Sequence, residues 1–379
     1  MRIFEHIQID WLGKRKIFYA VSLTLLVLGW TTVFIRGLHF GIDFKGGTEI
    51  VLEFQKPVNV SAMRDYLSNI GLGNVEIKTF GSQTGVLVRT EMQQLPKSLF
   101  PNIINSVNNS INKILPGLPA KVIDTTATSV TYQFANADTT NILVSGLFTQ
   151  GFQTGKVSEE PTNTQMLVRV GIADWLKENL SKKLNDNPFK VIKEDHVGPK
   201  VGNELKTNAV LAIFLSLVGI LIYLAFRFKF IFALGAVIAL FHDVLITIGL
   251  YAALYGVIPG LNLEIDLTVV AAFLTLIGYS VNDTVIVFDR VRENLKIHKT
   301  MNLEELINQS VNRTMSRTIL TAGTVLLAVL VLLIFGGEVL RAFSFTLFFG
   351  TITGTYSSIF IASALVLEYA NRFGKKVQF

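Results

Sequence analysis

Polar side chains interrupt a long apolar run in the last third of the sequence. Ser280, Asn282, Asp283 and Thr284 all lie within the run 267–288. A carboxylate surrounded by lipid is costly unless another group pairs with it or water reaches it, so such carboxylates usually mark an ion route. We therefore predict that Asp283 is a proton-responsive group held inside a bundle of membrane-spanning helices.

Arg317 is the candidate partner for this aspartate. About six residues, or roughly 9 Å of helix, separate Asp283 from the charged end of its run at Asp289. Arg317 stands at the start of the next apolar run, in SRTILTAGT (316–324), so we expect the two side chains at similar depth. An ion pair between them is geometrically reasonable. Such a pair would either help to control the proton on Asp283 or only fix the register of two helices.

His242 and Asp243 form a second polar pair, in the apolar stretch ALFHDVLIT (239–247). Because an imidazole titrates near neutral pH, one interpretation is that they extend a proton relay. The other is that they cap or pair with loops, since Arg227 and Lys229 precede them on the same segment. The sequence leaves both interpretations open. No further ligand cluster stands nearby, so no metal site is predicted.

The composition predicts the kind of protein that must position these residues. Half of the 379 residues are hydrophobic, 16% are charged, and the mean hydropathy is +0.47. These values indicate a polytopic membrane protein with one sizeable aqueous domain. The net charge of +6 comes from basic residues beside hydrophobic runs, so it reports topology and predicts no nucleic-acid partner. The chain has no cysteine, which excludes thiolate catalysis, disulfides and cysteine metal sites.

Six apolar runs are long enough to cross a bilayer as helices. Lys14, Arg15 and Lys16 precede the first run and no small-residue cleavage motif follows it, which predicts a signal anchor. Lys and Arg concentrate on one side of the predicted membrane, so both termini are expected in the cytoplasm, and Arg341 alone departs from this pattern. The predicted segments are a cytoplasmic N-terminus (1–16), membrane helices at 17–35, 208–226, 230–252, 267–288, 318–335 and 343–367, a cytoplasmic connector (289–317) and a cytoplasmic tail (368–379).

Within the connector, NLEELINQSVNRTM (302–315) is predicted to form a surface helix at the cytoplasmic interface. A solvated connector is the alternative. Small residues recur in the last run, where Gly350, Gly354, Ser358 and Ala362 follow one another at four-residue spacing. Such a stripe lets another helix approach closely. The sequence does not decide whether that helix is internal or belongs to a partner.

Residues 36–207 contain no further spanning run and are predicted to form an extracytoplasmic α+β domain. GIDFKGGTEIVLEF (41–54) leads into a β-rich run, and Met63, Leu67 and Ile70 lie at helical spacing in 61–70. The other expected elements are strands at 75–80 and 85–91 and, after an interruption, a strand at 164–170, a helix at 173–184 and a strand at 189–197. This order indicates a ferredoxin-like β-α-β-β-α-β arrangement.

The interruption is an insert at roughly 92–163, rich in Asn, Thr, Ser and Gly. It is predicted to contain a helix at 98–115, with a proline tolerated in its first turn, and strand-like runs near 121–135 and 141–149. Leu-Val-Arg occurs at 87–89 and again at 167–169, which is weak support for a partial internal duplication. Nothing in the insert's sequence predicts its role.

No motif for hydrolytic or group-transfer chemistry occurs in the sequence. A phosphate loop, a nucleophile elbow and an HExxH helix are all missing. We therefore predict that the chain is not an enzyme and needs no cofactor. An ion gradient, of H⁺ or alternatively Na⁺, is the expected energy source.

Motifs along nearly the whole chain resemble those of SecF subunits in the SecD/SecF family of bacterial protein-export proteins, within the RND superfamily. They are GIDFKGGT (41–48), HVGPKVG (196–202), ALFHDVLITIG (239–249), IGYSVNDTVIVFDRVREN (277–294), SRTILTAGT (316–324), FGGEVLRAFSFTLFFG (335–350) and GTYSSIFIA (354–362). The resemblance implies a twelve-helix unit split into two six-helix halves, the other half being SecD. The insert at 92–163 departs from the family's common pattern.

The resemblance also implies a function in the bacterial cytoplasmic membrane. The family is a proton-driven auxiliary that helps preproteins complete export after the SecA motor has acted. Its pathway aspartate and arginine match Asp283 and Arg317, with Asn282, Asp243 and His242 as candidates to extend the pathway, and a further aspartate comes from SecD. The implied partners are SecD, the SecYEG channel, YajC and YidC, together with unfolded preprotein at the extracytoplasmic domain.

Two other functions compete with this one. The first is an RND-type exporter half for small molecules or lipids, although such exporters usually carry twelve helices in one chain. The second is a scaffold that transports nothing, in which Asp283 and Arg317 serve only to hold two helices together.

Overall fold

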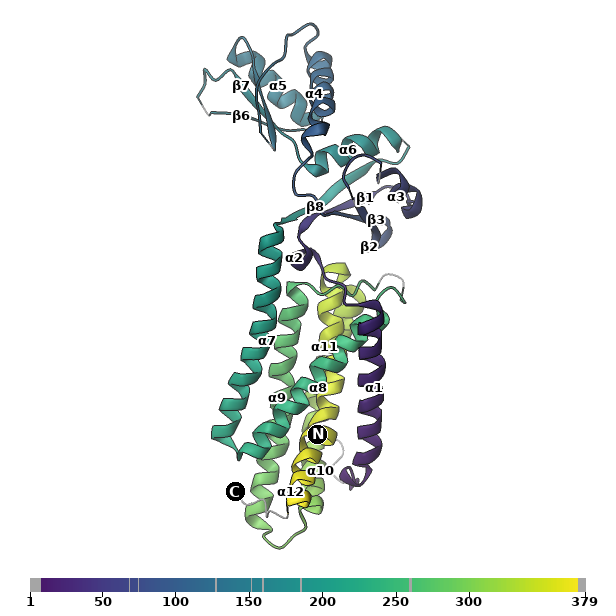
Figure 1. Ribbon diagram of the computed structural model, residues 1–379, viewed down its shortest axis with the longest axis vertical. Helices are drawn as coiled ribbons and strands as arrows, with labels where there is room; N and C mark the ends of the chain where they lie inside the picture. The colour runs from purple at the N-terminus through teal and green to yellow at the C-terminus, as the bar shows by residue number, and fades with distance from the viewer. Residues whose placement is uncertain are drawn as a thin grey trace. The chain divides into compact units, whose positions relative to one another are not determined.

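The structure is a computed structural model that describes residues 8–67, 69–73, 75–126, 128–150, 152–158, 160–184, 186–258 and 261–373. The chain divides into two compact units. We call them the helical unit, Met1–Phe44 with Asn203–Phe379, and the α+β unit, Lys45–Gly202. Their elements are labelled in Figure 1.

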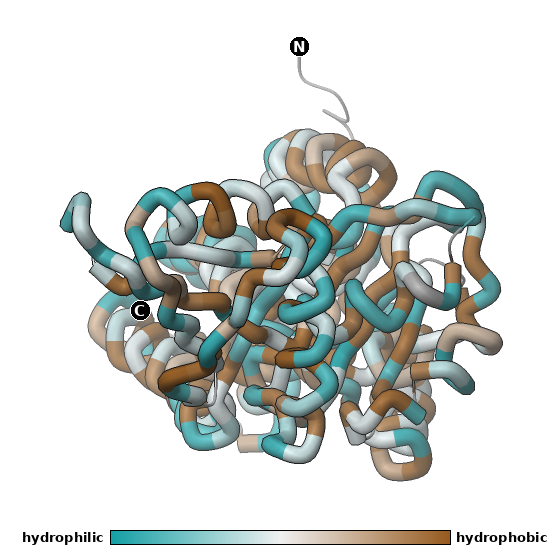
Figure 2. The backbone as a smooth tube through the Cα atoms, turned by 90° about the horizontal axis from the view of Figure 1, so that it is seen from above, coloured by the Kyte–Doolittle hydropathy of each residue, from teal (hydrophilic) through white to brown (hydrophobic). Residues whose placement is uncertain are grey.

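Six helical stretches in the described chain are long and apolar enough to cross a membrane. In Figure 2, where the backbone is coloured by hydropathy, hydrophobic residues appear as brown segments along the helices. The stretches are Leu12–Arg36, Pro199–Arg227, Phe230–Leu254, Leu267–Ile297, Leu303–Phe335 and Gly337–Phe373. They contain α1 (Arg15–Arg36), α7 (Pro199–Arg227), α8 (Phe230–Leu254), α9 (Leu267–Ile297), α10 (Leu303–Phe335), and α11 (Gly337–Ser357) with its continuation.

Several of these helices are longer than the apolar runs that predict them. α9 extends to Ile297 and α10 begins at Leu303, so the predicted connector is mostly helical. The separate surface helix predicted at 302–315 is wrong, because these residues are the first turns of α10. Asn302 caps them through its side chain, which accepts from the Glu304 amide, and no proline follows before Phe335.

The last apolar stretch is not a uniform α-helix. After α11, residues Ser358–Ser363 form a π-helical turn, and α12 (Ala364–Phe373) completes the stretch. Ser363 Oγ donates to the Ser358 carbonyl oxygen at 2.8 Å, which spans five residues and matches the wider turn. Single π-helical turns of this kind often occur at functional sites.

The first sheet of the α+β unit has the strand order β2-β3-β1-β8. Its strands are antiparallel, and α3 (Val60–Leu67) connects β1 to β2 while α6 (Ile172–Lys183) precedes β8. Counted along the chain without the insert, this is the 4-1-3-2 order of a ferredoxin-like sheet, as predicted. The strands are β1 (Gly47–Phe54), β2 (Val75–Phe80), β3 (Ser82–Thr90) and β8 (Phe189–Val197).

Two glycines shape the entry into this sheet after the short helix α2 (Ile42–Lys45). Gly46 and Gly47 have φ angles of 76° and 112°, a region that side chains disfavour. A Cβ on Gly47 would stand 2.3 Å from the carbonyl oxygen of Thr90 on β3. The glycines of GIDFKGGT therefore let the backbone turn and begin β1 against its neighbour.

The insert forms a second antiparallel sheet, in the order β4-β5-β7-β6. The predicted strand at 164–170 belongs to this sheet and not to the first one, because it pairs with β5 and β6. The insert therefore extends to the end of β7, beyond its predicted limit at 163. The strands are β4 (Lys121–Thr125), β5 (Ser129–Gln133), β6 (Gln153–Lys156) and β7 (Gln165–Arg169).

The strand-like run predicted at 141–149 is wrong, because these residues belong to the helix α5 (Ala137–Thr149). The Asn136 side chain caps its first turn by accepting from the Thr139 amide at 2.8 Å. Thr140, Leu143 and Leu147 are buried at helical spacing, so packing outweighs the β-branched composition of the run. The helix predicted at 98–115 is present as α4 (Phe100–Ile114).

The α+β unit repeats one small pattern, a helix followed by a β-hairpin. It occurs as α3-β2-β3, α4-β4-β5 and α5-β6-β7. The two Leu-Val-Arg triplets occupy β3 and β7, which are interior strands of their sheets. Arg89 of the first triplet is buried against Glu49, whereas Arg169 of the second is exposed. The repeated order agrees with the suggested duplication at the level of the fold.

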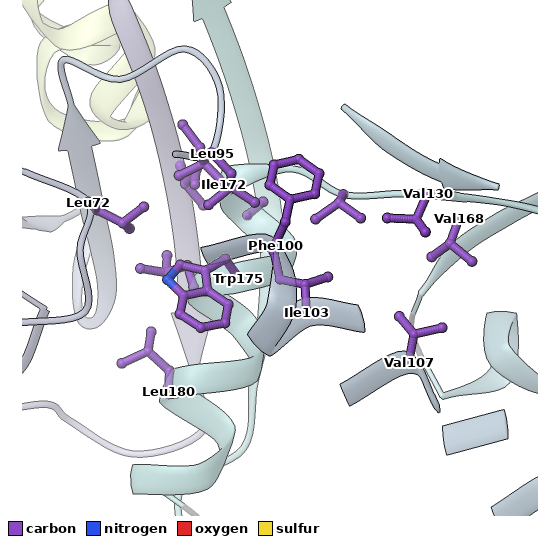
Figure 3. Close-up of a cluster of buried hydrophobic side chains, with 14 of the residues drawn as sticks. Leu72, Leu95, Phe100, Ile103, Val107, Val130, Val168, Ile172, Trp175 and Leu180 are labelled. Atoms are coloured by element: carbon purple, nitrogen blue, oxygen red, sulfur yellow. The ribbon is translucent and has the colours of Figure 1, made fainter. Parts of the chain in front are cut away.

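The α+β unit has two lobes, one built around each sheet, and one hydrophobic core joins them. Figure 3 shows Phe100 and Ile103 of α4 between Trp175 of α6 and the valines Val130 and Val168 of the second sheet. The indole nitrogen of Trp175 donates to the Ile70 carbonyl oxygen at 3.0 Å, which satisfies its polar atom inside the core. The insert is therefore packed against the rest of the domain through a shared core.

Candidate functional site

Asp283 lies on α9 in the interior of the helical unit. Its side chain is 1% exposed. Thr355 Oγ1 of α11 lies 3.5 Å from Asp283 Oδ2, in a direction that allows it to donate. A buried carboxylate with one long hydrogen bond and no close cation is expensive to keep ionised. Asp283 thus has little compensation for a negative charge in its surroundings.

Arg317 does not form the ion pair with Asp283 that the sequence makes reasonable. The guanidinium is close enough to act on the carboxylate electrostatically, but no nitrogen–oxygen contact within 4.0 Å joins them. Arg317 is exposed on α10, and Asn282, next to Asp283 on α9, is exposed as well. Two polar side chains therefore face outward from helices that are long and apolar enough to span a membrane.

Asp243 is another buried carboxylate of the helical unit, at 1% exposure on α8. Its Oδ2 atom accepts from Ser280 Oγ of α9 and from Ser357 Oγ of α11, each at 2.8 Å. Ser280 stands one helical turn from Asp283, and Ser357 stands two residues after Thr355. Helices α9 and α11 thus supply the hydroxyl groups that bind Asp243. The same two helices carry Asp283 and its donor Thr355.

His242 continues these contacts toward α1. Its Nδ1 lies 3.1 Å from Asp243 Oδ1, and its Nε2 lies 3.0 Å from Ser22 Oγ. The Ser22 hydroxyl lies 2.7 Å from the Tyr356 hydroxyl, which donates to the Phe18 carbonyl oxygen at 2.6 Å. These contacts favour the relay over the alternative that His242 and Asp243 pair with loops, because both side chains point into the helix bundle.

The two glycines of the small-residue stripe, Gly350 and Gly354 on α11, pack against an internal helix. A Cβ on Gly354 would lie 2.8 Å from Ser280 Oγ, and one on Gly350 would lie 2.5 Å from Leu276 Cδ2, both on α9. Ser358 Oγ donates to the Thr355 carbonyl oxygen within its own helix. The stripe therefore lets α9 and α11 approach closely enough for their hydroxyl groups to reach both carboxylates.

A second close approach holds α1 against α8. A Cβ on Gly29 would lie 2.8 Å from the Cα of Gly249, and one on Gly249 would lie 2.9 Å from the Cα of Gly29. Backbone thus faces backbone at this crossing. The crossing positions Ser22 of α1 beside His242 of α8.

Charges at the ends of the helices are paired locally. Arg227 lies 3.1 Å from Asp289, and Arg292 lies 2.7 Å from the same carboxylate. Arg341, which departs from the predicted charge asymmetry, forms an ion pair with Glu338 one turn earlier. The local pair lowers the electrostatic cost of a basic residue on that side of the predicted membrane.

The sequence does not reveal the hydroxyl groups that complete the site. Ser22, Thr355, Tyr356 and Ser357 occur within apolar segments and show no helical periodicity of their own. Their partners are far away along the chain, with Ser22 and His242 separated by 220 positions. The only available signal in the sequence is that four consecutive hydroxyl residues, 355–358, follow Gly354.

The arrangement suits proton binding better than it suits bond chemistry. Two buried carboxylates, an imidazole and five hydroxyl groups converge from α1, α8, α9 and α11. Among the described residues, no group of three or more His, Cys, Asp or Glu side chains could hold a metal ion. Buried ionisable groups in membrane helices of this kind mark ion pathways.

Family models match two parts of the chain. The model described as "Protein export membrane protein SecD/SecF, C-terminal" matches residues 176–372, and the one described as "SecD/SecF GG Motif" matches residues 32–58. The first covers α7 to α12 and hence both Asp243 and Asp283. The second includes the positive-φ glycines that begin β1.

Curated relatives match almost from end to end. The protein translocase subunit SecF of Rhodothermus marinus is 37% identical over 372 residues, which cover 98% of this chain and 96% of the relative. The subunit of the same name from Calditerrivibrio nitroreducens is 36% identical over 360 residues, covering 94% and 93%. That of Rickettsia conorii is 32% identical over 372 residues, covering 98% and 95%.

A solved structure has the same fold. The crystal structure of SecDF, a translocon-associated membrane protein from Thermus thermophilus, matches with a TM-score of 0.66 and 29% identity over 98% of this chain. The chain spans 40% of the length of that protein. The fold is thus an RND-type half with six candidate membrane helices and an α+β domain. The chain belongs to the SecD/SecF family of protein-export membrane proteins, as a protein translocase subunit of the SecF type with a role in Sec protein export.

Proposed function

We propose that the chain works with SecD as a proton-driven auxiliary of protein export, and that Asp283 is its protonation site. The observation that carries the proposal is the position of Asp283, buried among helices with Thr355 as its hydrogen-bond donor and without an ion pair. An ionised carboxylate there is poorly compensated, whereas a protonated one is acceptable. A change of protonation therefore changes how α9, α10 and α11 pack.

Arg317 supports a site that is completed by a partner subunit. The side chain is exposed on a predicted membrane helix, where an unpaired guanidinium is costly. Together with the exposed Asn282, it supports the approach of a partner helix carrying an acidic residue, which SecD is expected to supply. Proton transfer between this acid and Asp283 would pass the positive charge of Arg317.

The remaining partners follow from the place of the family in export. SecYEG is the expected channel, with YajC and YidC as further candidates, and unfolded preprotein is expected to meet the α+β unit outside the cytoplasm. The protein would lie in the bacterial inner membrane with both termini in the cytoplasm. Basic residues near the ends of the helices, including Arg15 and Arg372, support this orientation.

The test is Asp283→Asn in membrane vesicles that contain SecD and the export channel. We expect the variant to co-purify with SecD, because asparagine fills the same space and can still accept from Thr355. Export that depends on the proton gradient should be lost. Asp289→Asn is the matched control, since Asp289 lies on the same helix but is half exposed and paired with Arg227.

The alternatives have distinct outcomes. Unchanged export in Asp283→Asn would favour the scaffold and overturn the proposal. Imposing H⁺ and Na⁺ gradients separately identifies the coupling ion. If export failed to respond to either gradient while a lipid or small molecule moved, the exporter half would be favoured instead.

A further inference from the structure

The hydrogen bonds between Phe18 and Asp243 have only one possible direction. They begin at the carbonyl oxygen of Phe18, which lies 2.6 Å from the Tyr356 hydroxyl. A carbonyl oxygen only accepts, so the single hydrogen of this hydroxyl points to Phe18. Without it, two oxygens would face each other at 2.6 Å with no proton between them.

The direction of the next two bonds follows. The Tyr356 hydroxyl has no second hydrogen, so Ser22 must donate across the 2.7 Å contact between them. The hydrogen of Ser22 is then also used. His242 Nε2, 3.0 Å from Ser22 Oγ, must therefore carry its own hydrogen and donate it. The tautomer of His242 is thus set by a carbonyl group on another helix.

The last contact needs one more proton. Nδ1 of His242 and Oδ1 of Asp243 are 3.1 Å apart, and both would be bare if the histidine were neutral and the aspartate ionised. Two lone pairs would then face each other in the helix interior. One proton between them removes this conflict, whether it resides on the imidazole or on the carboxyl group, and leaves the pair without net charge.

The surroundings also disfavour an uncompensated negative charge. Asp243 Oδ2 accepts from Ser280 and Ser357, and no Lys or Arg of the described chain comes within 4.0 Å of the carboxylate. The nearest titratable groups on the neighbouring helices are Tyr356 of α11, whose ring stacks on His242 with centroids 6.1 Å apart, and Asp283, one turn after Ser280 on α9. Neither of them can supply a positive charge.

We infer that His242 and Asp243 are a second proton-binding site of the helical unit, which holds one proton between Nδ1 and Oδ1 and is oriented by Ser22 and Tyr356. The site joins α1 to α8, α9 and α11, so loss of its proton would disturb four helices at once. This inference deepens the proposed function, on which its role in export depends. The placement of the proton depends only on the contacts.

The test is the protonation of each His242 nitrogen in the full chain, labelled with ¹⁵N-histidine and reconstituted in lipid bilayers. Solid-state NMR distinguishes a nitrogen that carries hydrogen from a bare one, and His242→Asn identifies the signals. We expect a protonated Nε2 hydrogen-bonded to Ser22 and a proton shared between Nδ1 and Asp243. A bare Nε2 in the wild-type chain would overturn the inference.

Two variants test the orientation. Tyr356→Phe removes the group that uses the hydrogen of Ser22, so Ser22 becomes free to donate to His242 and a bare Nε2 signal should appear. Ser22→Ala removes the acceptor and should also release the tautomer. Tyr369→Phe on α12 is the control, because its hydroxyl forms no hydrogen bond with the pair, and it should leave the spectrum unchanged.

These outcomes are separate from those of the export test. An unchanged spectrum in both Tyr356→Phe and Ser22→Ala, with each variant folded by size-exclusion chromatography, would contradict the assigned direction. Loss of export in Asp283→Asn does not affect the spectrum of His242 directly. The NMR experiment therefore tests the second site independently of the export proposal.

Discussion

Buried carboxylates are stabilised in different ways in the two units. In the helical unit, hydroxyl groups and one histidine surround Asp243, and a single hydroxyl group approaches Asp283. In the α+β unit, Glu49 instead forms a buried ion pair with Arg89, whose Nη2 lies 2.6 Å from Glu49 Oε2. A full ion pair holds its charges permanently, whereas hydroxyl groups tolerate both the ionised and the protonated carboxyl. The residues around Asp243 and Asp283 therefore permit a change of protonation.

Asp174 gives a pH-dependent prediction at the start of α6. It accepts from the Gly171 amide at 3.0 Å, but burial and, to a smaller extent, Glu194 raise its pKa to about 6. Because the folded pKa lies above the unfolded value, this contribution to stability is present at low pH and is lost as the pH rises through about 6. The full effect is at most about 3 kcal/mol.

We therefore expect the wild-type α+β unit, within the full chain, to become more resistant to urea between pH 7 and pH 5. Asp174→Asn keeps an acceptor for Gly171 and removes the titration, so its dependence on pH should be flatter over this window. The measurement is the urea midpoint by tryptophan fluorescence, since Trp175 is the neighbouring residue. Identical pH profiles for the two proteins would contradict the prediction.

Among the elements, close helix crossings determine whether the site can form. The α1–α8 crossing at Gly29 and Gly249 positions Ser22 beside His242, and the α9–α11 crossing at Gly354 positions Ser280 near Asp243. Neither crossing has room for a side chain. The hydrogen bonds of His242 and Asp243 thus depend on glycines that form none of these bonds themselves.

Gly249→Ala tests the first crossing. The new Cβ would meet the backbone of Gly29 at 2.9 Å, and backbone cannot move aside as a flexible side chain can. We expect a loss of about 1–3 kcal/mol of stability, seen as a lower melting temperature in detergent, together with a changed His242 NMR signal. Gly219→Ala on α7 is the matched control, because nothing lies within 4 Å of its Cβ position. Equal effects from the two variants would count against the crossing.

At the scale of the whole α+β unit, the two lobes should unfold together because they share one core. Trp175, at 7% exposure, belongs to this shared core, and Trp175→Ala should cost about 3–5 kcal/mol. Hydrogen exchange on the full chain should then become faster in both sheets. Ile123→Ala, at an exposed position on the edge strand β4, should leave exchange nearly unchanged. Faster exchange confined to the first sheet would show that the lobes are independent.

The helical unit was largely predictable from its sequence, because a spanning helix needs a long apolar run and six such runs are visible. The second sheet was less predictable. The strand at 164–170 has the same alternation whichever sheet it joins, and only the register of β7 with β5 and β6 decides the matter. The run 141–149 is rich in β-formers, yet a cap at Asn136 and a buried helical face make it a helix.

The site was predictable in part. Asp283, His242 and Asp243 are polar residues in apolar runs, so composition alone singles them out. The partners of His242 could not be found in this way, because hydrogen bonds between distant helices leave no pattern in the sequence. The distance between Asp283 and Arg317 depends on the rotation of two helices, which the spacing of residues within each run does not fix.

The π-helical turn at Ser358–Ser363 gives the last stretch one residue more than an α-helix would fit in the same rise. If these residues tightened into ordinary α-helix, everything beyond Ser363 would rotate by about 100°. Glu368 now reaches Arg15 at 2.9 Å, at the start of α1. Such a rotation would carry Glu368 away and leave Arg15 paired with Glu304 of α10 alone, at 3.0 Å. The extra residue at Ser358–Ser363 thus fixes the helical phase at which Glu368 can meet Arg15.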